Sequence, residues 1–68
     1  MAGVVRSDAD NLRAAIAGET HEATVMYPTF AARADAAGDH QAARVFRRNA
    51  EDEAAHARTF QYLLNHPR

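Results

Sequence analysis

The sequence predicts an all-α protein, a long antiparallel hairpin of two helices that pairs with a second copy into a four-helix bundle. In both halves of the chain the apolar residues recur at alternating steps of three and four, which is typical of packed helices. One glycine-centred break, Gly38-Asp39, separates the two halves. A chain of 68 residues also buries too little surface to be stable without a metal or a partner, so we expect a homodimer or a higher oligomer.

Residues that favour helix caps mark the ends of both helices. Ser7-Asp8-Ala9-Asp10 resembles a capping box, Gly38 is typical of the position after a helix, and Asn65-His66-Pro67 is typical of a stop. We therefore expect one domain over residues 1–68, with a helix over about 8–37, a turn at 38–39 and a helix over about 40–64.

Pro28 is the one residue that conflicts with this pattern. A proline inside a helix removes one backbone hydrogen bond and clashes with the preceding turn. Because the apolar spacing continues on both sides of Pro28, we expect one helix with a kink or bulge near Val25, and not two separate helices.

The composition excludes several classes of protein. The chain has no cysteine, which excludes disulfides, zinc fingers and sulfur-ligated iron and leaves oxygen and imidazole nitrogen as the ligands of any metal. The formal net charge is −1 and the arginines lie among acids, so nucleic acid is not an expected partner. No stretch of signal-peptide or membrane-spanning length is present, and we expect a cytoplasmic protein without a membrane partner.

Ionisable residues interrupt both apolar stripes. The first stripe consists of Leu12, Ile16, Glu19, Ala23, Met26 and Phe30, and the second of Ala42, Phe46, Asn49, Glu53, His56, Phe60 and Leu63. The phenylalanines are expected to form the core. Burying a lone charge is costly, so Glu19, Glu53 and His56 are expected to be paired, protonated or bound to a metal.

Charged residues outside the stripes are expected to face solvent. Arg47 and Arg48 precede Glu51 and Asp52 by four residues, a spacing that forms surface ion pairs worth about 0.2–0.5 kcal/mol each. We therefore do not count Glu51 and Asp52 among the candidate ligands.

Four residues are candidate metal ligands. Glu19 and Glu22, and likewise Glu53 and His56, are three residues apart on one helix, so each pair directs two side chains toward one point. With a rise of ~1.5 Å per residue, Glu19 and Glu22 lie roughly 28 and 24 Å before Gly38, and Glu53 and His56 roughly 22 and 27 Å after it. The four side chains are therefore expected at one level of the hairpin.

Two hairpins related by a two-fold axis would double this set inside four helices. Bundles of this kind hold two iron or two manganese ions with a Glu from each of two helices and a Glu-x-x-His from each of the others. Glu19 and Glu53-Ala54-Ala55-His56 supply that set. Six carboxylates around two divalent ions would leave about two excess negative charges. We therefore expect Glu22 to bind when the metals become more positive and to withdraw, or take up a proton, when they are reduced.

Three motifs occur in order along about fifty of the 68 residues: Gly18-Glu19-x-x-Glu22, Met26-Tyr27-Pro28-x-Phe30-Ala31 and Glu53-x-x-His56. Together they resemble the second helical hairpin of the di-iron domain of the rubrerythrin family, in the ferritin-like superfamily. The resemblance implies a ferritin-like bundle and a non-haem di-iron peroxidase that reduces hydrogen peroxide to water. It also implies that Glu53 bridges the irons, that Glu19 and His56 are terminal ligands, and that Glu22 exchanges with redox state.

The chain departs from this family in two respects. His21 and Ala23 stand where members often have tyrosines, which changes the hydrogen bonding expected around the ligands. Members usually carry both hairpins and a cysteine-ligated rubredoxin domain in one chain, whereas this sequence has one hairpin and no cysteine. We therefore expect homodimerisation to replace the second hairpin and an external electron donor, such as a rubredoxin-like protein, to supply electrons, unless the chain is a fragment of a longer protein.

The residues leave two other functions open. A ferroxidase or iron-handling protein would use the same ligands without turning over peroxide. A metal-independent dimerisation module would use the acids and His56 as a polar layer that fixes the helix register. Oxygen and nitrogen ligands also allow manganese or zinc in place of the two iron ions expected per dimer.

Overall fold

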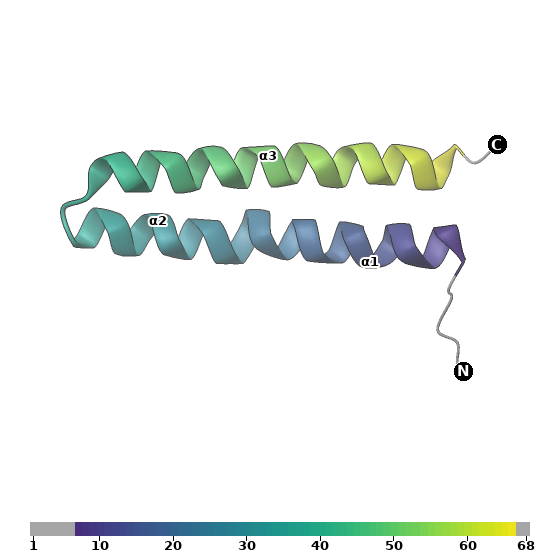
Figure 1. The fold of residues 1–68 in the computed structure, drawn as a ribbon, viewed down its shortest axis with the longest axis horizontal. Coiled ribbons are helices and arrows are strands. Elements are labelled where there is room, and N and C mark those ends of the chain that lie inside the picture. Colours follow the sequence, from purple (N-terminus) through teal and green to yellow (C-terminus); the bar gives the residue numbers. More distant parts are fainter. Residues whose placement is uncertain (1–6, 67–68) are drawn as a thin grey trace.

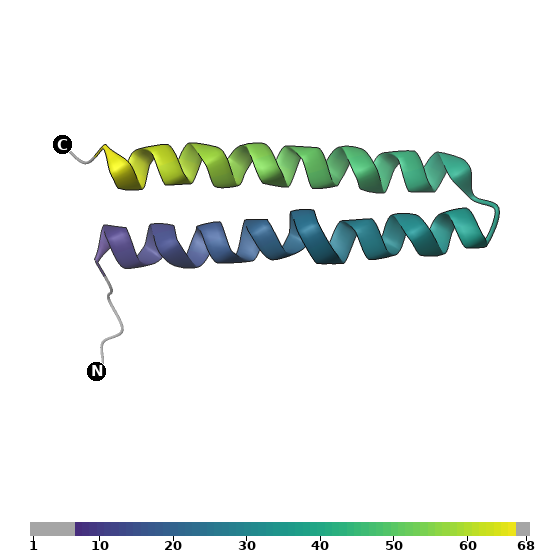
Figure 2. The same cartoon turned by 180° about the vertical axis from the view of Figure 1, so that it is seen from behind.

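The computed structural model describes residues 7–66, which form two antiparallel helical rods (Figure 1). The first rod consists of α1 (Asp8–His21), the π-helical turn η1 (Glu22–Met26) and α2 (Tyr27–Ala36), and the second rod is α3 (His40–Asn65). Seen from behind, the rods again lie side by side along their whole length (Figure 2). The predicted all-α hairpin is therefore confirmed. No helix within residues 7–66 is long and apolar enough to cross a membrane.

Side chains cap the start of both rods. The Ser7 hydroxyl accepts a 3.2 Å hydrogen bond from the Asp10 N–H at the start of α1, and Asp39 Oδ1 accepts one of 3.1 Å from a backbone N–H in the first turn of α3. These bonds satisfy donors that have no partner inside the helix. At the other end α3 continues to Asn65, one residue beyond the expected end. Pro67, part of the expected stop, lies outside the described residues.

Gly38 reverses the chain in a conformation that favours glycine. Its φ is +81°, in the left-handed region. The Gly38 N–H donates to the Asp35 carbonyl at 2.9 Å and the Asp39 N–H donates to the Ala34 carbonyl at 2.8 Å. This is the Schellman pattern, which satisfies the last carbonyls of α2.

Two glycine substitutions should shift the stability in opposite directions. Gly38→Ala should lower the free energy of unfolding by about 1–2 kcal/mol, because a Cβ at positive φ clashes with its own backbone even though nothing else lies within 4 Å. Gly18→Ala, in α1 with equally open space around it, should raise this free energy by about 0.5–1 kcal/mol. Urea denaturation of the two variants tests the pair, and shifts of the same sign would contradict the explanation.

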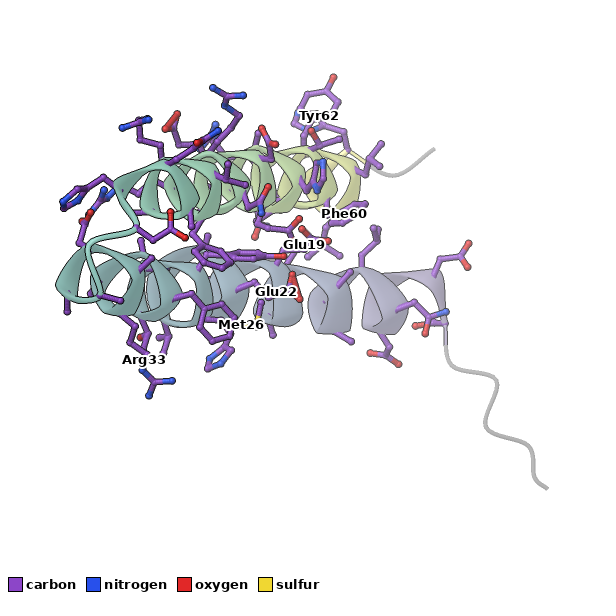
Figure 3. The ribbon with its side chains drawn as sticks, turned by 60° about the vertical axis from the view of Figure 1, so that its left-hand side comes forward. Glu19, Glu22, Met26, Arg33, Phe60 and Tyr62 are labelled. Atoms are coloured by element: carbon purple, nitrogen blue, oxygen red, sulfur yellow. The ribbon has the colours of Figure 1, made fainter. Side chains whose placement is uncertain are left out.

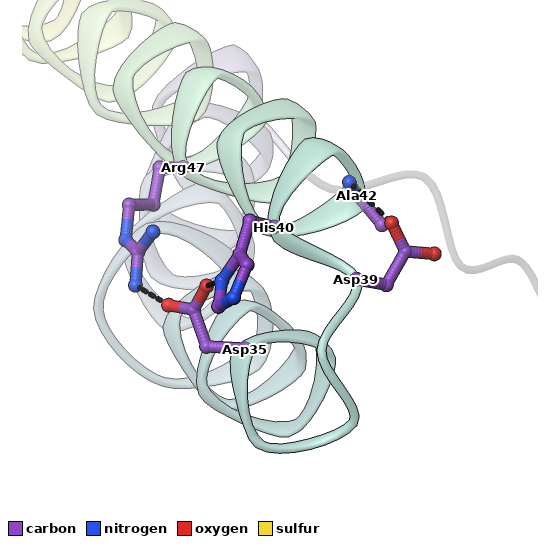
Figure 4. A network of polar contacts seen from close by, with 5 residues as sticks. All are labelled: Asp35, Asp39, His40, Ala42 and Arg47. Atoms are coloured by element: carbon purple, nitrogen blue, oxygen red, sulfur yellow. Dashed lines mark hydrogen bonds and ion pairs between the residues drawn. The ribbon is translucent and has the colours of Figure 1, made fainter.

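An ion-pair network joins the two rods near the turn (Figure 4). His40 Nδ1 lies 2.7 Å from Asp35 Oδ1, and Arg47 donates to Asp35 Oδ2, so α2 is tied to α3 at two points. These bonds hold the pKa of Asp35 below its ordinary value, with the His40 hydrogen bond as the largest cause and Arg47 as the next. The predicted pairing of Arg47 with Glu51 is wrong for the described hairpin, because Arg47 reaches the carboxylate across the turn instead.

Asp35→Asn should lower the melting temperature at neutral pH but not in acid. An unfolded aspartate titrates near about 3.9, and the folded Asp35 has a lower pKa. Its charged form therefore stabilises the fold above the ordinary pKa, and this contribution is lost as the pH falls through the folded pKa. Thermal unfolding should separate variant from parent at pH 6, and the difference should shrink progressively as the pH falls below the ordinary pKa of aspartate and through the lower pKa of the folded Asp35. Asp52→Asn, exposed on α3, is the control; a difference for Asp35→Asn that persisted in acid would contradict the ionic explanation.

A single wide turn joins α1 to α2. The Tyr27 N–H donates to the Glu22 carbonyl five residues back, the hydrogen bond of a π-helix. Pro28 follows in the first turn of α2, where its missing N–H costs least. The predicted bulge near Val25 is therefore confirmed, and Pro28 accounts for its position.

The core of the described hairpin is small. Ala31, at 1% exposed, and Ala43, at 0%, are its only fully buried apolar residues. The prediction that Phe30 belongs to the core is wrong for the single hairpin, since Phe30 is 36% exposed. It lies at the edge, with its ring centroid 5.4 Å from that of Phe46 and 6.3 Å from that of Tyr27. The wide turn of η1 holds one residue more than an α-helical turn would. This extra residue turns Phe30 to the side of the rod and brings Ala31 to face α3.

Candidate metal centre

Three of the four predicted ligands converge midway along the hairpin. Glu19 on α1 and Glu53 and His56 on α3 each offer one ligand atom, and these atoms all lie within 4.8 Å of one another. His56 Nδ1 is 3.2 Å from Glu19 Oε2 and 3.4 Å from Glu53 Oε1. Figure 3 shows Glu19 between the two rods. A cation at this point could replace the imidazole hydrogen bond and contact all three side chains. We call these residues the ligand group.

Helix geometry explains this convergence. Glu53 and His56 are three residues apart in an unbroken α-helix, so their side chains share a face. Glu19 lies nineteen residues before Gly38 and His56 lies eighteen residues after it, so antiparallel rods bring them to the same level. The 3.2 Å contact between their side chains agrees with the heights expected from the sequence.

Glu22 lies beside the ligand group but outside it. It is the first residue of η1 and is half-buried. The pKa of Glu22 is raised above its ordinary value, chiefly because its carboxyl shares a hydrogen bond with Glu53, and further by partial burial and the negative charge of Glu53. Figure 3 shows Glu22 next to Glu19, on the side of the rod that faces α3. The spacing along the first helix predicted Glu22 as a candidate ligand, but it did not show that Glu22 would share a hydrogen bond with Glu53.

The ligand group is covered on one side and open on the other. The side chains of Glu19 and Glu53 are only 23% and 18% exposed, whereas His56 is 57% exposed. Val45 and Leu63, both about half exposed, lie eleven residues before and seven residues after His56. At about 100° per residue each lies within about 20° of it around the helix. We call Val45, His56 and Leu63 the α3 stripe. The second apolar stripe predicted from the sequence contains Phe46 and Leu63, but it does not contain Val45.

A helical hairpin with carboxylate and imidazole donors converging at one level belongs to the class of helical proteins that can hold metals with oxygen and nitrogen ligands. Comparison with protein families narrows this class. The family model for rubrerythrin matches residues 2–64 of the chain. The chain belongs to the rubrerythrin family.

Two curated relatives agree with this assignment. The rubrerythrin of Porphyromonas gingivalis is 49% identical over 65 residues, which cover 96% of this chain and 32% of that protein. The rubrerythrin of Nitratidesulfovibrio vulgaris is 44% identical over 59 residues, which cover 87% of this chain and 31% of that protein. The chain thus spans about a third of the length of the curated relatives it matches. No solved structure matches it significantly.

Proposed function

We propose that two copies of the chain together bind two iron ions and reduce hydrogen peroxide to water. The observation that carries this proposal is the convergence of Glu19, Glu53 and His56 in a hairpin of the rubrerythrin family. Oxygen and imidazole nitrogen suit iron in a helical bundle. In this proposal Glu19 and His56 are terminal ligands, Glu53 bridges the two ions, and Glu22 is the mobile carboxylate.

Charge balance supports two ions for each pair of chains. A pair contributes four carboxylates from two copies of Glu19 and Glu53, and their four negative charges match two divalent cations. Two copies of Glu22, beside but outside the ligand group, would add the two further charges that trivalent cations require. Glu22 would therefore approach the ligand group when its positive charge rises and withdraw when that charge falls.

Bound iron would supply the two electrons, one from each ion, that convert one hydrogen peroxide into two waters. The same conversion consumes two protons, and Glu22 is the candidate to hold one of them in each chain. A protonated Glu22 carboxyl can donate to Glu53, the hydrogen bond that raises its pKa in the metal-free hairpin. On moving toward the ligand group as a carboxylate, Glu22 would release that proton. Glu22 is therefore the catalytic residue of the proposal.

A second copy of the chain is the proposed cover for the open side of the ligand group. The described hairpin fully buries only Ala31 and Ala43 among its apolar residues, too little for a stable fold by itself. The α3 stripe leaves Val45 and Leu63 half exposed beside His56, on the side where the ligand group is open. A two-fold axis there would double the ligands and bury both stripes, and two-fold dimers are the commonest symmetric oligomers.

Electrons from outside the ligand group are needed to return the oxidised ions to their reduced state. A rubredoxin-like donor is the proposed partner. Reduction of the oxidised protein by added reduced rubredoxin, measured as the loss of the visible absorption of the oxidised protein, tests this partner separately from the peroxide reaction.

Metal content of the protein purified without added metal tests the function. We expect about one iron per chain, and we expect helicity and pairing to depend on this iron. The reduced protein should consume peroxide faster than oxygen. Iron at that ratio with oxygen consumed in preference would indicate a ferroxidase. Full helicity and pairing after exhaustive chelation, with no iron recovered before it, would indicate a metal-independent dimerisation module.

A further inference from the structure

The two halves of the first rod present α3 with residues that a continuous α-helix could not align. Glu19 and Ala31 both face α3, one in the ligand group and the other in the core. Twelve residues separate them, which at about 100° per residue leaves them about 120° apart around an α-helix. Eleven residues would leave them about 20° apart. The rod therefore holds one residue more than an α-helix allows, and η1 accommodates it.

Side chains beyond η1 agree with this shift by one residue. In a continuous α-helix Arg33 would lie within about 40° of the direction of Glu19 and would face α3. In the structure Arg33 is exposed and points away from α3 (Figure 3). Tyr27 instead faces α3, where its ring stacks on Phe46 at a centroid distance of 6.3 Å.

Three residues favour the wide turn over an α-helical one. Pro28 has no N–H to donate to the carbonyl four residues back, so it disfavours an α-helix through η1. The Thr24 hydroxyl donates to the Thr20 carbonyl at 2.7 Å, and the Thr29 hydroxyl donates to the Val25 carbonyl at 2.6 Å. Such bonds bend a helix and supply donors to carbonyls beside a disrupted turn.

The closed end of the hairpin determines which half would rotate if η1 were lost. Asp35 is held by His40 and Arg47, and Gly38 fixes the reversal of the chain. α2 therefore keeps its orientation toward α3. Conversion of η1 to an α-helical turn would turn α1 by about 100° and carry Glu19 away from His56.

We propose that η1 is a register element that positions the ligand group, and that Pro28, Thr24 and Thr29 are the positioning residues that hold it. The register claim rests on the geometry alone, and its consequence for metal affinity rests on the proposed function. The extra residue in η1 allows Glu19 of α1 and Ala31 of α2 to face α3 together.

Deletion of Val25 and the substitution Pro28→Ala, singly and combined, test the register claim. The deletion alone forces Pro28 into a continuous α-helix, and Pro28→Ala alone permits an α-helical η1 with one residue too many. Either change should weaken the nuclear Overhauser contacts between Glu19 and His56 in the metal-free protein. The combined variant needs no wide turn, so it should fold and recover these contacts. Full contacts in Pro28→Ala alone would overturn the proposal, and so would a combined variant that fails to fold or to recover them.

Binding of Co²⁺ alone to the same four proteins measures the consequence for the site. Each single change should weaken Co²⁺ binding about tenfold or more, the effect typical of residues that orient ligands, and the combined variant should regain the affinity and the visible absorption spectrum. If the parent binds no Co²⁺ while the Overhauser contacts follow the expected pattern, the proposed function fails and the register claim stands. If Co²⁺ binds equally to all four proteins, the positioning role is overturned and the proposed function stands.

The two threonines are tested against a matched hydroxyl. Thr59 makes the same bond to the carbonyl four residues back, from its hydroxyl to Ala55 at 3.2 Å, but on α3 and away from η1. Thr24→Val combined with Thr29→Val should weaken the contacts between Glu19 and His56 and lower Co²⁺ affinity, whereas Thr59→Val should change neither. Equal effects of the two sets would show that the threonine hydroxyls have no special role in η1.

Discussion

Iron content should fall from about one ion per chain to almost none when Glu53 is replaced by alanine, and peroxide turnover should fall with it. Glu53 is the least exposed member of the ligand group, with 18% of its side chain accessible. It lies 3.4 Å from His56, and it is the neighbour that shares a hydrogen bond with Glu22. Removing it takes two carboxylates from the proposed dimer site and leaves two divalent ions with too little negative charge.

The expected loss of affinity exceeds that for a residue outside the ligand group. Changes in residues that only orient metal ligands cost about 10–100-fold, so loss of the proposed bridging ligand should cost more than about 100-fold. Iron per chain after gel filtration, together with the rise in melting temperature on adding Fe²⁺, measures this effect. Saturating metal at 100 times its Kd would stabilise the parent by about 2.7 kcal/mol, and the variant should lose that rise.

Glu51→Ala is the matched control for Glu53→Ala. Glu51 is an exposed glutamate on the same helix, two residues away and on a different face. Its removal should leave iron content and turnover unchanged. Metal-free Glu53→Ala should also keep its melting temperature within about 8 °C of the parent, because a partly exposed ion pair contributes about 1 kcal/mol or less. Unchanged iron content in Glu53→Ala would remove Glu53 from the ligand set.

The sequence was sufficient to predict the level at which the ligand group forms. The rise per residue of an α-helix is nearly constant, so distances counted from Gly38 placed Glu19 opposite His56, and the structure has them 3.2 Å apart. A wide turn changes the rise along a rod little. The predicted level of Glu19 along the hairpin was therefore correct despite η1.

Rotation around the rod could not be predicted in the same way. One extra residue in η1 changes the facing direction of everything after it by about 100°, so the apolar spacing that appeared to continue through Pro28 pointed to Phe30 where Ala31 is buried. Pro28 gave the location of the disturbance but not its size, since a kink and a wide turn follow from the same missing N–H. The hydrogen bond from the Tyr27 N–H to the Glu22 carbonyl and the burial of Ala31 distinguish the two in the structure.

Partners across the hairpin were the other part that the sequence left undetermined. Arg47 had an acidic residue at helical spacing, Glu51, and a second one, Asp35, twelve residues away on the other rod. The structure pairs it with Asp35. Counting from the turn could have predicted the pairing of Asp35 with His40, which lie three and two residues from Gly38. It could not have predicted Arg47, which lies nine residues after Gly38 and contacts Asp35 through a long side chain.

Val45→Glu should dissociate the proposed dimer and, with it, the iron. Val45 is 51% exposed in the single hairpin and lies within about 20° of His56 around α3. Its burial by a second copy would occur twice in a two-fold dimer. Losing about 1.5 kcal/mol of apolar burial at each copy, even before the cost of an unpaired carboxylate, would raise the dimer Kd at least about 100-fold. Sedimentation equilibrium over a range of concentrations measures this shift.

Tyr62→Glu separates pairing through the α3 stripe from a general effect of added charge. Tyr62 is more exposed than Val45, at 61%, but it lies about 120° from His56 around α3, stacks on His66 and points away from the first rod (Figure 3). This variant should pair and bind iron like the parent. Raising the concentration of Val45→Glu should restore its pairing and its iron together, because the ligand group of one chain is only half of the proposed site. A Val45→Glu protein that remained monomeric and still held one iron per chain would show that the hairpin binds metal without a second copy.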